Sequence, residues 1–347
     1  MTKLNKHLYK LSIFYGLCLS LVLISCDSNP LDIDVSDVEV TLKLERMEQD
    51  VFTDNIPSAI ERNKILIKKY GLLYEAFMME MIGEGSPYDA EAAMYLKNFS
   101  EHPDMKEIYQ EIDNKYHDFS KYHTEIEGCF KYYKHYFPDS TLPTVITFYS
   151  NFNANIFPYD NNLAIGLDMY LGTDHELVKS LPIQFFPQYL KDRMKAEYLV
   201  ADAMKGWLMN RFANEIADGD DFLSTIVTLG KVMYLLDAMM PLEEDHIKFG
   251  CSKGQLEWCR TQEQNIWKTI IDDQVLYAKD KGLILQYVSD GPFTKGMPHE
   301  SPSKVGVWLG WQIVRDYVEQ NEVSVTDLLK QKSPKVILKS YSQGDRD

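Results

Sequence analysis

The sequence predicts an α+β fold that is predominantly helical and contains a small sheet. Apolar residues recur at helical spacing through most of the 347-residue chain, and only a few short segments have the pattern of strands. No repeat period or low-complexity tract is visible. Since no segment resembles a linker, we expect one domain over residues 38–341, followed by a tail over 342–347.

The N-terminus has the features of a bacterial lipoprotein signal. A lysine-containing start precedes the apolar stretch Leu11–Ile24, which is too short to span a bilayer comfortably. The stretch ends in "LISC", which resembles a lipobox: the small Ser25 lets a signal peptidase approach, and the thiol of Cys26 receives diacylglycerol. We therefore expect a signal peptide over 1–25, a lipidated cysteine and tether over 26–37, and a chain anchored to a membrane without spanning it. An ordinary secretory signal with a chance cysteine is the alternative.

The composition and the N-terminal signal together limit where the protein is located and which kinds of partner it can bind. The formal net charge is −16, and removal of the signal's lysines makes the remainder more acidic. Such a body is a poor nucleic-acid binder and is repelled by anionic lipid surfaces, but it is compatible with basic protein partners. We expect a lipid-anchored protein of the cell envelope, with the outer membrane favoured. Asp27, directly after the cysteine, keeps the inner membrane as an alternative.

Local patterns predict the first elements of the domain. The segment "VEVTLKLER" (residues 38–46) alternates apolar and polar residues from Val38 to Glu45, as a half-buried strand does. Ser58 opens a capping box, and helical spacing then continues to about Phe137. Breaks are expected near Gly85–Pro87 and Pro103, because glycine and proline interrupt helices.

The middle of the chain changes character and then returns to helix. Pro143–Ser150 and Asn162–Gly172 are predicted strands, joined by a loop rich in asparagine. Helices are predicted over Ala196–Phe212 and over Asp221–Met240, where acidic residues suit the helix start. Further helical segments lie on both sides of a polar loop, Ser289–Lys304.

The last long helix is predicted over Ser301–Asn321. Ser301 is expected to cap it, and Pro302 suits its first turn. The helix carries two glycines four residues apart, which give a smooth face, and bulky tryptophans around it: Gly306, Gly310, Trp308 and Trp311. Packing in the core is the favoured interpretation of this face, and a docking surface for a partner is the alternative.

One segment contains half of a zinc-peptidase motif. His175 and Glu176 stand side by side, as in an HExxH helix, but Lys179 occupies the place of the second histidine. A protonated lysine has no lone pair for a metal, so a charged helix start is the favoured interpretation. A hydrolase that uses His175, Glu176 and Asp202 at an atypical site is the alternative. A second pair, His299–Glu300, lies in a proline-rich loop.

The acidic run before the helix at 221–240 has two interpretations. Asp218, Asp220 and Asp221 offer oxygen ligands, but the run is too short for an EF-hand calcium loop. Helix capping is therefore favoured over calcium binding.

The cysteines beyond the signal form no zinc-finger pattern. Cys251 and Cys259 are close enough in sequence to pair in an exported protein, which would leave Cys129 as an odd thiol. Free buried cysteines are the other possibility, and no base beside Cys129 marks it as a nucleophile.

The order of several segments carries a family resemblance. From about Val38 to Tyr341, "AIGLDMYLG", "EYLVADAMKGWL", "GKVMYLLDAMMP", "GPFTKGMPHESPSKVGVWLGWQIVRDYV" and "LLKQKSPKVILKSYS" together resemble the gliding-motility lipoprotein family GldB. The resemblance implies a lipid-anchored envelope protein that is required for gliding over surfaces. It also implies an apparatus linked to secretion across the outer membrane, with other, unidentified envelope proteins as partners.

That family is similar, more distantly, to zincin-like peptidases. By segment order the metal helix of a zincin would be "AEYLVADAMKGWL", and Leu229 would precede Gly230 where a glutamate ligand belongs. The residues at the expected ligand positions of the metal helix are Ala201, Asp202, Lys205 and Gly206. The resemblance therefore implies a zincin-like body without zinc ligands: a non-catalytic scaffold with no cofactor and no metal. A ligand-capture lipoprotein is a further alternative, since aromatic residues make up 12% of the chain and can stack on sugars.

Overall fold

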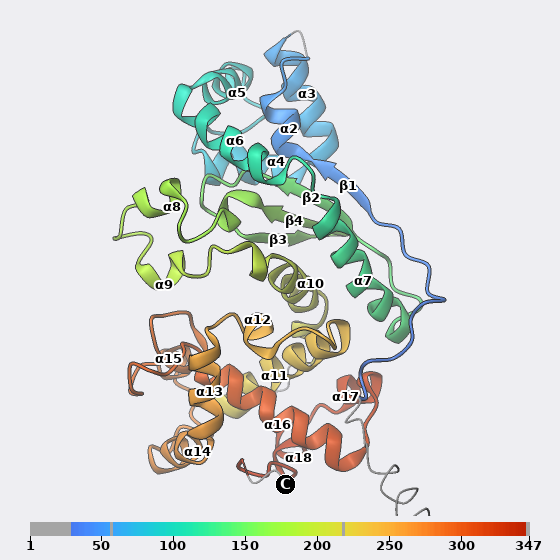
Figure 1. Ribbon diagram of the computed structural model, residues 1–347, viewed down its shortest axis with the longest axis vertical. Helices are drawn as coiled ribbons and strands as arrows, with labels where there is room; N and C mark the ends of the chain where they lie inside the picture. Colours follow the sequence, from blue (N-terminus) through green and yellow to red (C-terminus); the bar gives the residue numbers. More distant parts are fainter. Residues whose placement is uncertain (1–28, 56–57, 217–218, 345–347) are drawn as a thin grey trace, which may run out of the picture. The chain divides into compact units, whose positions relative to one another are not determined.

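The computed structural model describes residues 29–55, 58–216 and 219–344 (Figure 1). The expected signal peptide, Cys26 and Asp218 lie outside these residues. By its internal contacts the chain divides into residues 1–33 and 34–347. Every helix and strand named below belongs to the second unit, and they confirm the predicted class, a mainly helical α+β fold.

The described residues contain a mixed four-stranded sheet in the order β1-β2-β4-β3. Its strands are β1 (Lys43–Arg46), β2 (Thr144–Phe148), β3 (Ile156–Tyr159) and β4 (Asn162–Gly166). β2 runs parallel to both β1 and β4, and β3 runs antiparallel to β4. All residues from Val145 to Phe148 are buried, so both faces of β2 are covered.

Two of the predicted strands differ in length from the observed ones. Burial alternates over residues 38–44, but Glu45, which the pattern predicts to be exposed, is half-buried, and pairing with β2 begins only at Lys43. The strand predicted over Asn162–Gly172 ends at Gly166, and the 3-10 turn η2 (Leu167–Tyr170) follows it. A Cβ atom on Gly166 would lie 2.0 Å from the carbonyl oxygen of Ala154, so the preceding loop crosses directly over this position.

Strand β3 lies in the segment that was expected to be a loop. Its Pro158 cannot donate a backbone hydrogen bond, which argues against a central strand. In the structure β3 is at the edge of the sheet, where a proline is tolerated. Helix α10 packs against β3 through Gly206, where a Cβ atom would lie 2.5 Å from Ile156.

The helices between β1 and β2 confirm the predicted helical region and its breaks. Ser58 accepts a hydrogen bond from the backbone of Glu61 and so caps α3. The elements are α2 (Met47–Phe52), α3 (Ala59–Tyr70), α4 (Leu72–Ala76), the π-helical turn η1 (Phe77–Met81), α5 (Ala92–Glu101), α6 (Pro103–Tyr116) and α7 (Ser120–Tyr136).

The helices after the sheet are shorter and more numerous than the patterns suggested. They are α8 (Glu176–Ser180), α9 (Gln188–Lys191), the 3-10 turn η3 (Ala196–Tyr198), α10 (Leu199–Ile216), α11 (Phe222–Met239), α12 (Asp245–Phe249), α13 (Lys253–Thr261), α14 (Glu263–Asp272), α15 (Lys281–Val288), α16 (Val305–Asn321), α17 (Val325–Lys330) and α18 (Pro334–Leu338). Asp221 accepts from the backbone of Ser224 and caps α11, as the capping interpretation predicts, while Asp220 pairs with Lys279.

The predicted start of the last long helix is wrong. α16 begins at Val305, after Lys304 in the left-handed conformation (φ 62°), and Ser301 is buried without capping it. The cap comes from the preceding loop, because the hydroxyl of Thr294 accepts from the backbone N–H of Val305 and donates to the carbonyl of Pro302.

Helices α11 and α16 lie side by side and cross at two glycines (Figure 1). A Cβ atom on Gly310 would lie 1.9 Å from the carbonyl oxygen of Ile226, and one on Gly230 would lie 2.2 Å from that of Gly310. Gly306 faces α15 at Tyr287, and Trp308 and Trp311 are buried. The structure therefore places the predicted glycine and tryptophan face in the packed interior.

Helix α11 is also long and apolar enough to cross a membrane by length and composition. However, 83% of its apolar window is buried inside the protein. Among the described residues it therefore has the properties of a core helix.

The crossing predicts a strong effect of one added methyl group. Gly310→Ala should lower the free energy of unfolding by about 3 kcal/mol, because the two backbones must separate to admit the Cβ atom. Equilibrium urea unfolding monitored by circular dichroism measures this change.

Gly128→Ala on α7 is the matched control, since a Cβ atom there meets nothing within 4 Å. It should leave stability unchanged or raise it by about 0.5–1 kcal/mol. Equal effects of the two substitutions would contradict the close crossing.

Candidate functional site

The first turns of α10 lie at the centre of a cluster of charged side chains. Asp202 and Lys205 are three residues apart on one face of the helix, where the zincin resemblance expects metal ligands. Arg193 follows α9, Asp290 follows α15, and Lys304 directly precedes α16. We call these residues, Arg193, Asp202, Lys205, Asp290 and Lys304, the Arg193 cluster.

Arg193 connects the two carboxylates of this cluster. Its Nη2 lies 3.3 Å from Oδ1 of Asp202, and its Nη1 lies 3.4 Å from Oδ1 of Asp290. Lys205 Nζ is 3.3 Å from Asp202, and Lys304 Nζ is 2.6 Å from Asp290. Three cations thus surround two carboxylates, so the cluster carries a formal surplus of one positive charge.

The cations of the cluster are mostly buried, whereas one of the carboxylates is not. The exposed fractions of Arg193, Lys205 and Lys304 are 23%, 22% and 17%. Asp290 is 53% exposed, so water screens part of its charge. Arg193 and Asp290 line an open cleft of about 690 Å³, together with Tyr198 and residues before α16.

Burial is the main cause of the pKa shifts of the two lysines, and the neighbouring cations add to it. Burial, assisted by Arg193 and Lys205, lowers the pKa of Lys304 to about 8. Burial also lowers the pKa of Lys205, although Asp202 opposes this shift. Burial alone would lower the pKa of Arg193, but the two carboxylates raise it on balance. The site therefore favours an incoming negative group and repels an incoming cation.

The other positions of the zincin resemblance serve packing. Ala201 is fully buried, Gly206 packs on β3, and Gly230 forms the crossing with α16. Over the part of the chain that the structure describes, no group of three or more histidine, cysteine, aspartate or glutamate residues is placed to hold a metal ion.

The residues of the atypical-hydrolase alternative have separate partners. His175 caps α8, and its Nε2 lies 3.1 Å from a carboxylate oxygen of Glu111. Glu176 is 88% exposed and pairs with Lys179, one turn along the same short helix. Asp202 belongs to the Arg193 cluster. The second His-Glu pair, His299–Glu300, lies in a loop as predicted, and the ring of His299 packs against Phe293.

The three cysteines of the domain are buried and free. Burial raises the pKa of both Cys129 and Cys251 to about 12, and it raises that of Cys259 as well. A nucleophilic cysteine must be a thiolate, so none of these thiols is activated near neutral pH.

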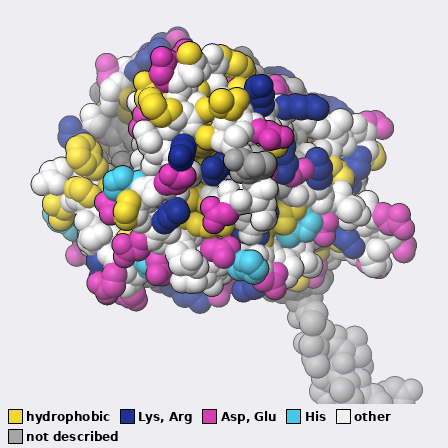
Figure 2. Space-filling model, turned by 90° about the horizontal axis from the view of Figure 1, so that it is seen from above, with side chains coloured by type: hydrophobic (Ala, Val, Ile, Leu, Met, Phe, Trp, Pro, Cys, Tyr) yellow, Lys and Arg dark blue, Asp and Glu magenta, His cyan; other side chains and the backbone are white. Residues whose placement is uncertain are grey.

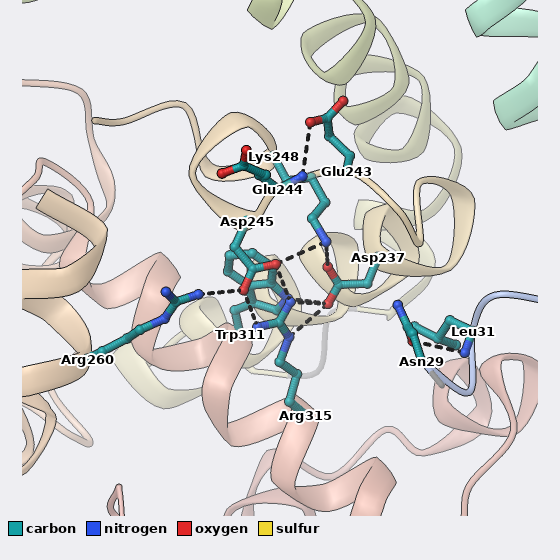
Figure 3. Close-up of polar contacts among 10 residues, drawn as sticks. All are labelled: Asn29, Leu31, Asp237, Glu243, Glu244, Asp245, Lys248, Arg260, Trp311 and Arg315. Atoms are coloured by element: carbon teal, nitrogen blue, oxygen red, sulfur yellow. Dashed lines mark hydrogen bonds and ion pairs between the residues drawn. The ribbon is translucent and has the colours of Figure 1, made fainter. Parts of the chain in front are cut away.

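A second polar group links the C-terminal helices (Figure 3). Trp311 Nε1 donates to Asp237 at 2.7 Å, and the guanidinium of Arg315 stacks 3.9 Å from the centre of the Trp311 ring. Arg315 also binds both carboxylate oxygens of Asp245 at 2.7 and 2.9 Å, and Lys248 pairs with both aspartates. We call these residues the Trp311 network. It joins α11, α12 and α16.

Most residues of the Arg193 cluster and of the Trp311 network were not predicted from the sequence. Lys205 was identified only through the zincin register, and Asp202 through that register and the atypical-hydrolase alternative. Arg193, Asp290 and Lys304 were not identified. One local signal was present: Arg315 follows Trp311 by four residues, the spacing at which helical side chains meet.

On the face seen in Figure 2, no large patch consists of a single kind of side chain. Acidic and basic side chains are interspersed there, and apolar groups lie between them. That face has no large basic field of the kind that binds nucleic acid.

Comparison with known protein families identifies the family of the chain. The sequence model of the family described as gliding motility protein GldB matches residues 28–343. No curated protein and no solved structure matches the chain, so the zincin-like resemblance stays a prediction.

The Trp311 network predicts a pH-dependent loss of stability. Burial opposes ionisation of Asp245, but Arg315 and Lys248 hold its pKa well below the ordinary value of 3.8. Its carboxylate therefore stabilises the fold fully above about pH 4 and progressively less as the pH falls through the lowered pKa.

Asp245→Asn should lower the free energy of unfolding by about 3 kcal/mol at pH 7, since it leaves Arg315 without its bidentate partner. The difference from the natural protein should shrink as the pH falls below 4. Urea unfolding across this range measures both effects. Glu176→Gln, at an exposed pair, should change stability by no more than about 0.5 kcal/mol at any pH.

Proposed function

The chain belongs to the gliding motility protein GldB family, and from this premise we propose that it is a lipid-anchored envelope scaffold that supports surface gliding without catalysis. The match over nearly the whole chain supports the gliding role. Its partners are other envelope proteins of the motility apparatus and of the secretion system linked to it.

The proposed anchor is the acylated thiol of Cys26. The lipobox at the end of the signal supports it, and each buried methylene of an acyl chain contributes about 0.8 kcal/mol to membrane binding. Among the described residues the exposed apolar side chains include Ile183 and Phe185, which lie close together in the segment before α9. In this proposal the acyl chains provide the membrane affinity.

The charges on α10 support the absence of catalysis. A zinc ion needs neutral or anionic ligands, and the expected ligand positions hold Asp202, already paired, and the cationic Lys205. Arg193 and Lys304 add positive charge beside them. The separate partners of His175 and Glu176 weigh against the atypical-hydrolase alternative.

Labelling in a gliding host tests the anchor and the gliding role together. Deletion of the gene should abolish surface spreading, and the natural gene should restore both spreading and incorporation of labelled palmitate. Cys26→Ala should restore neither, because the acceptor thiol is missing.

Cys18→Ala, within the signal, is the matched control and should behave like the natural gene. Normal spreading of the deletion strain would contradict the gliding role. Labelled Cys26→Ala protein would contradict the anchor site.

Metal content tests the non-catalytic part of the proposal. The mature chain, purified in detergent without chelators or a histidine tag, should contain well below one zinc per chain. Elemental mass spectrometry measures this ratio. A stoichiometric zinc that survives His175→Ala but not Asp202→Asn would place a metal on α10 and overturn the scaffold assignment.

A further inference from the structure

We propose that the Arg193 cluster binds a single carboxylate group, which enters through the adjoining cleft. This inference goes beyond the gliding role and does not depend on it. It assigns a ligand to a site that the scaffold proposal leaves unused.

The charge balance of the cluster selects a singly charged anion. Arg193, Lys205 and Lys304 exceed Asp202 and Asp290 by one positive charge, in a chain whose formal net charge is −16. Water still reaches each of these cations, whose exposed fractions are 23%, 22% and 17%, so the surplus charge attracts an anion from solution. One carboxylate makes the cluster neutral, whereas a doubly charged phosphate reverses its sign.

The hydrogen-bond donors of the cluster are under-used. The contacts of Arg193 with its carboxylates, at 3.3 and 3.4 Å, are longer than the roughly 2.7–2.9 Å of strong charge-assisted bonds. Among the described residues, Lys205 and Lys304 each pair with one carboxylate, although an ammonium group has three donors. A third carboxylate can therefore bind without displacing Asp202 or Asp290.

The backbone around the cluster holds these donors in place. Gly250 (φ 80°) lets the guanidinium approach, since a Cβ atom there would lie 2.5 Å from Arg193 Nη2. The ring of Tyr198 lies 6.0 Å from the same guanidinium and also lines the cleft. Lys304 has a left-handed backbone that is unfavourable for lysine, and such strain is concentrated at functional sites.

Two sources of the carboxylate are distinguished by the choice of probe. Acetate represents a small free acid, and N-acetyl-trialanine represents the C-terminus of a peptide. The amide of that peptide, sodium chloride and inorganic phosphate are the comparison ligands. All are titrated against the mature full chain at pH 7 and constant ionic strength, with thermal unfolding as the measurement.

Binding of a carboxylate should raise the melting temperature by about 2 °C or more at saturation. Chloride and the peptide amide should have no such effect. A rise in melting temperature with acetate shows that a small free acid is sufficient for binding. A rise with N-acetyl-trialanine alone shows that the site requires the C-terminus of a peptide. Both results support the proposal. An equal response to chloride, or a stronger one to phosphate, overturns it.

Lys304→Asn tests the site itself, because asparagine tolerates the left-handed conformation while the charge is lost. Its affinity for the carboxylate probe should fall about tenfold or more. Lys330→Asn, at an exposed pair with Asp327, should bind like the natural chain. If Lys304→Asn does not fold, Lys205→Gln is the second variant, and its affinity for the carboxylate probe should also fall. Unchanged affinity in either folded variant overturns the assignment.

Discussion

The close approach of α11 and α16 at Gly230 and Gly310 determines the arrangement of the C-terminal helices. Only hydrogen atoms fit between the two backbones at this point. At this separation Trp311 Nε1 reaches the carboxylate of Asp237 across the helix pair (Figure 3). Arg315 then stacks on the indole and extends to Asp245 on α12. Desolvation offsets most of the attraction within a buried ionic group of this kind, so removing one partner costs more stability than the intact group contributes.

The same crossing positions the Arg193 cluster. Lys304 directly precedes α16, and Asp290 follows α15, which packs on α16 at Gly306 and Tyr287. Asp202 and Lys205 belong to α10, which packs on α11. The cluster therefore joins α10, which packs on α11, to the start of α16. The glycine crossing holds α11 and α16 together. A change at the crossing would displace cations and carboxylates relative to each other, even though no residue of the crossing belongs to the cluster.

The sequence predicted those parts of the molecule whose causes are local. Ser58 and Asp221 cap their helices through bonds within three residues, and burial alternates along residues 38–44 as their pattern indicates. The missed parts have distant causes. β3 exists because β4 pairs with it, despite Pro158, and α16 starts at Val305 because Thr294 caps it from a loop. The Arg193 cluster combines residues up to 111 positions apart, from Arg193 to Lys304, so no motif could reveal it.

The electrostatics of the whole chain bear on the source of the proposed carboxylate. A body with a formal charge of −16 repels free anions at a distance, and this slows their encounter with the cleft. The cluster attracts a carboxylate only at short range, since salt screens exposed charges beyond about 10 Å. A carboxylate carried by a protein in the same membrane is already held near the cleft, so its local concentration depends less on diffusion from the medium. If the chain is anchored as proposed, its short-range site therefore meets a carboxylate on a neighbouring envelope protein more readily than one dissolved in the medium, although the site itself can bind either.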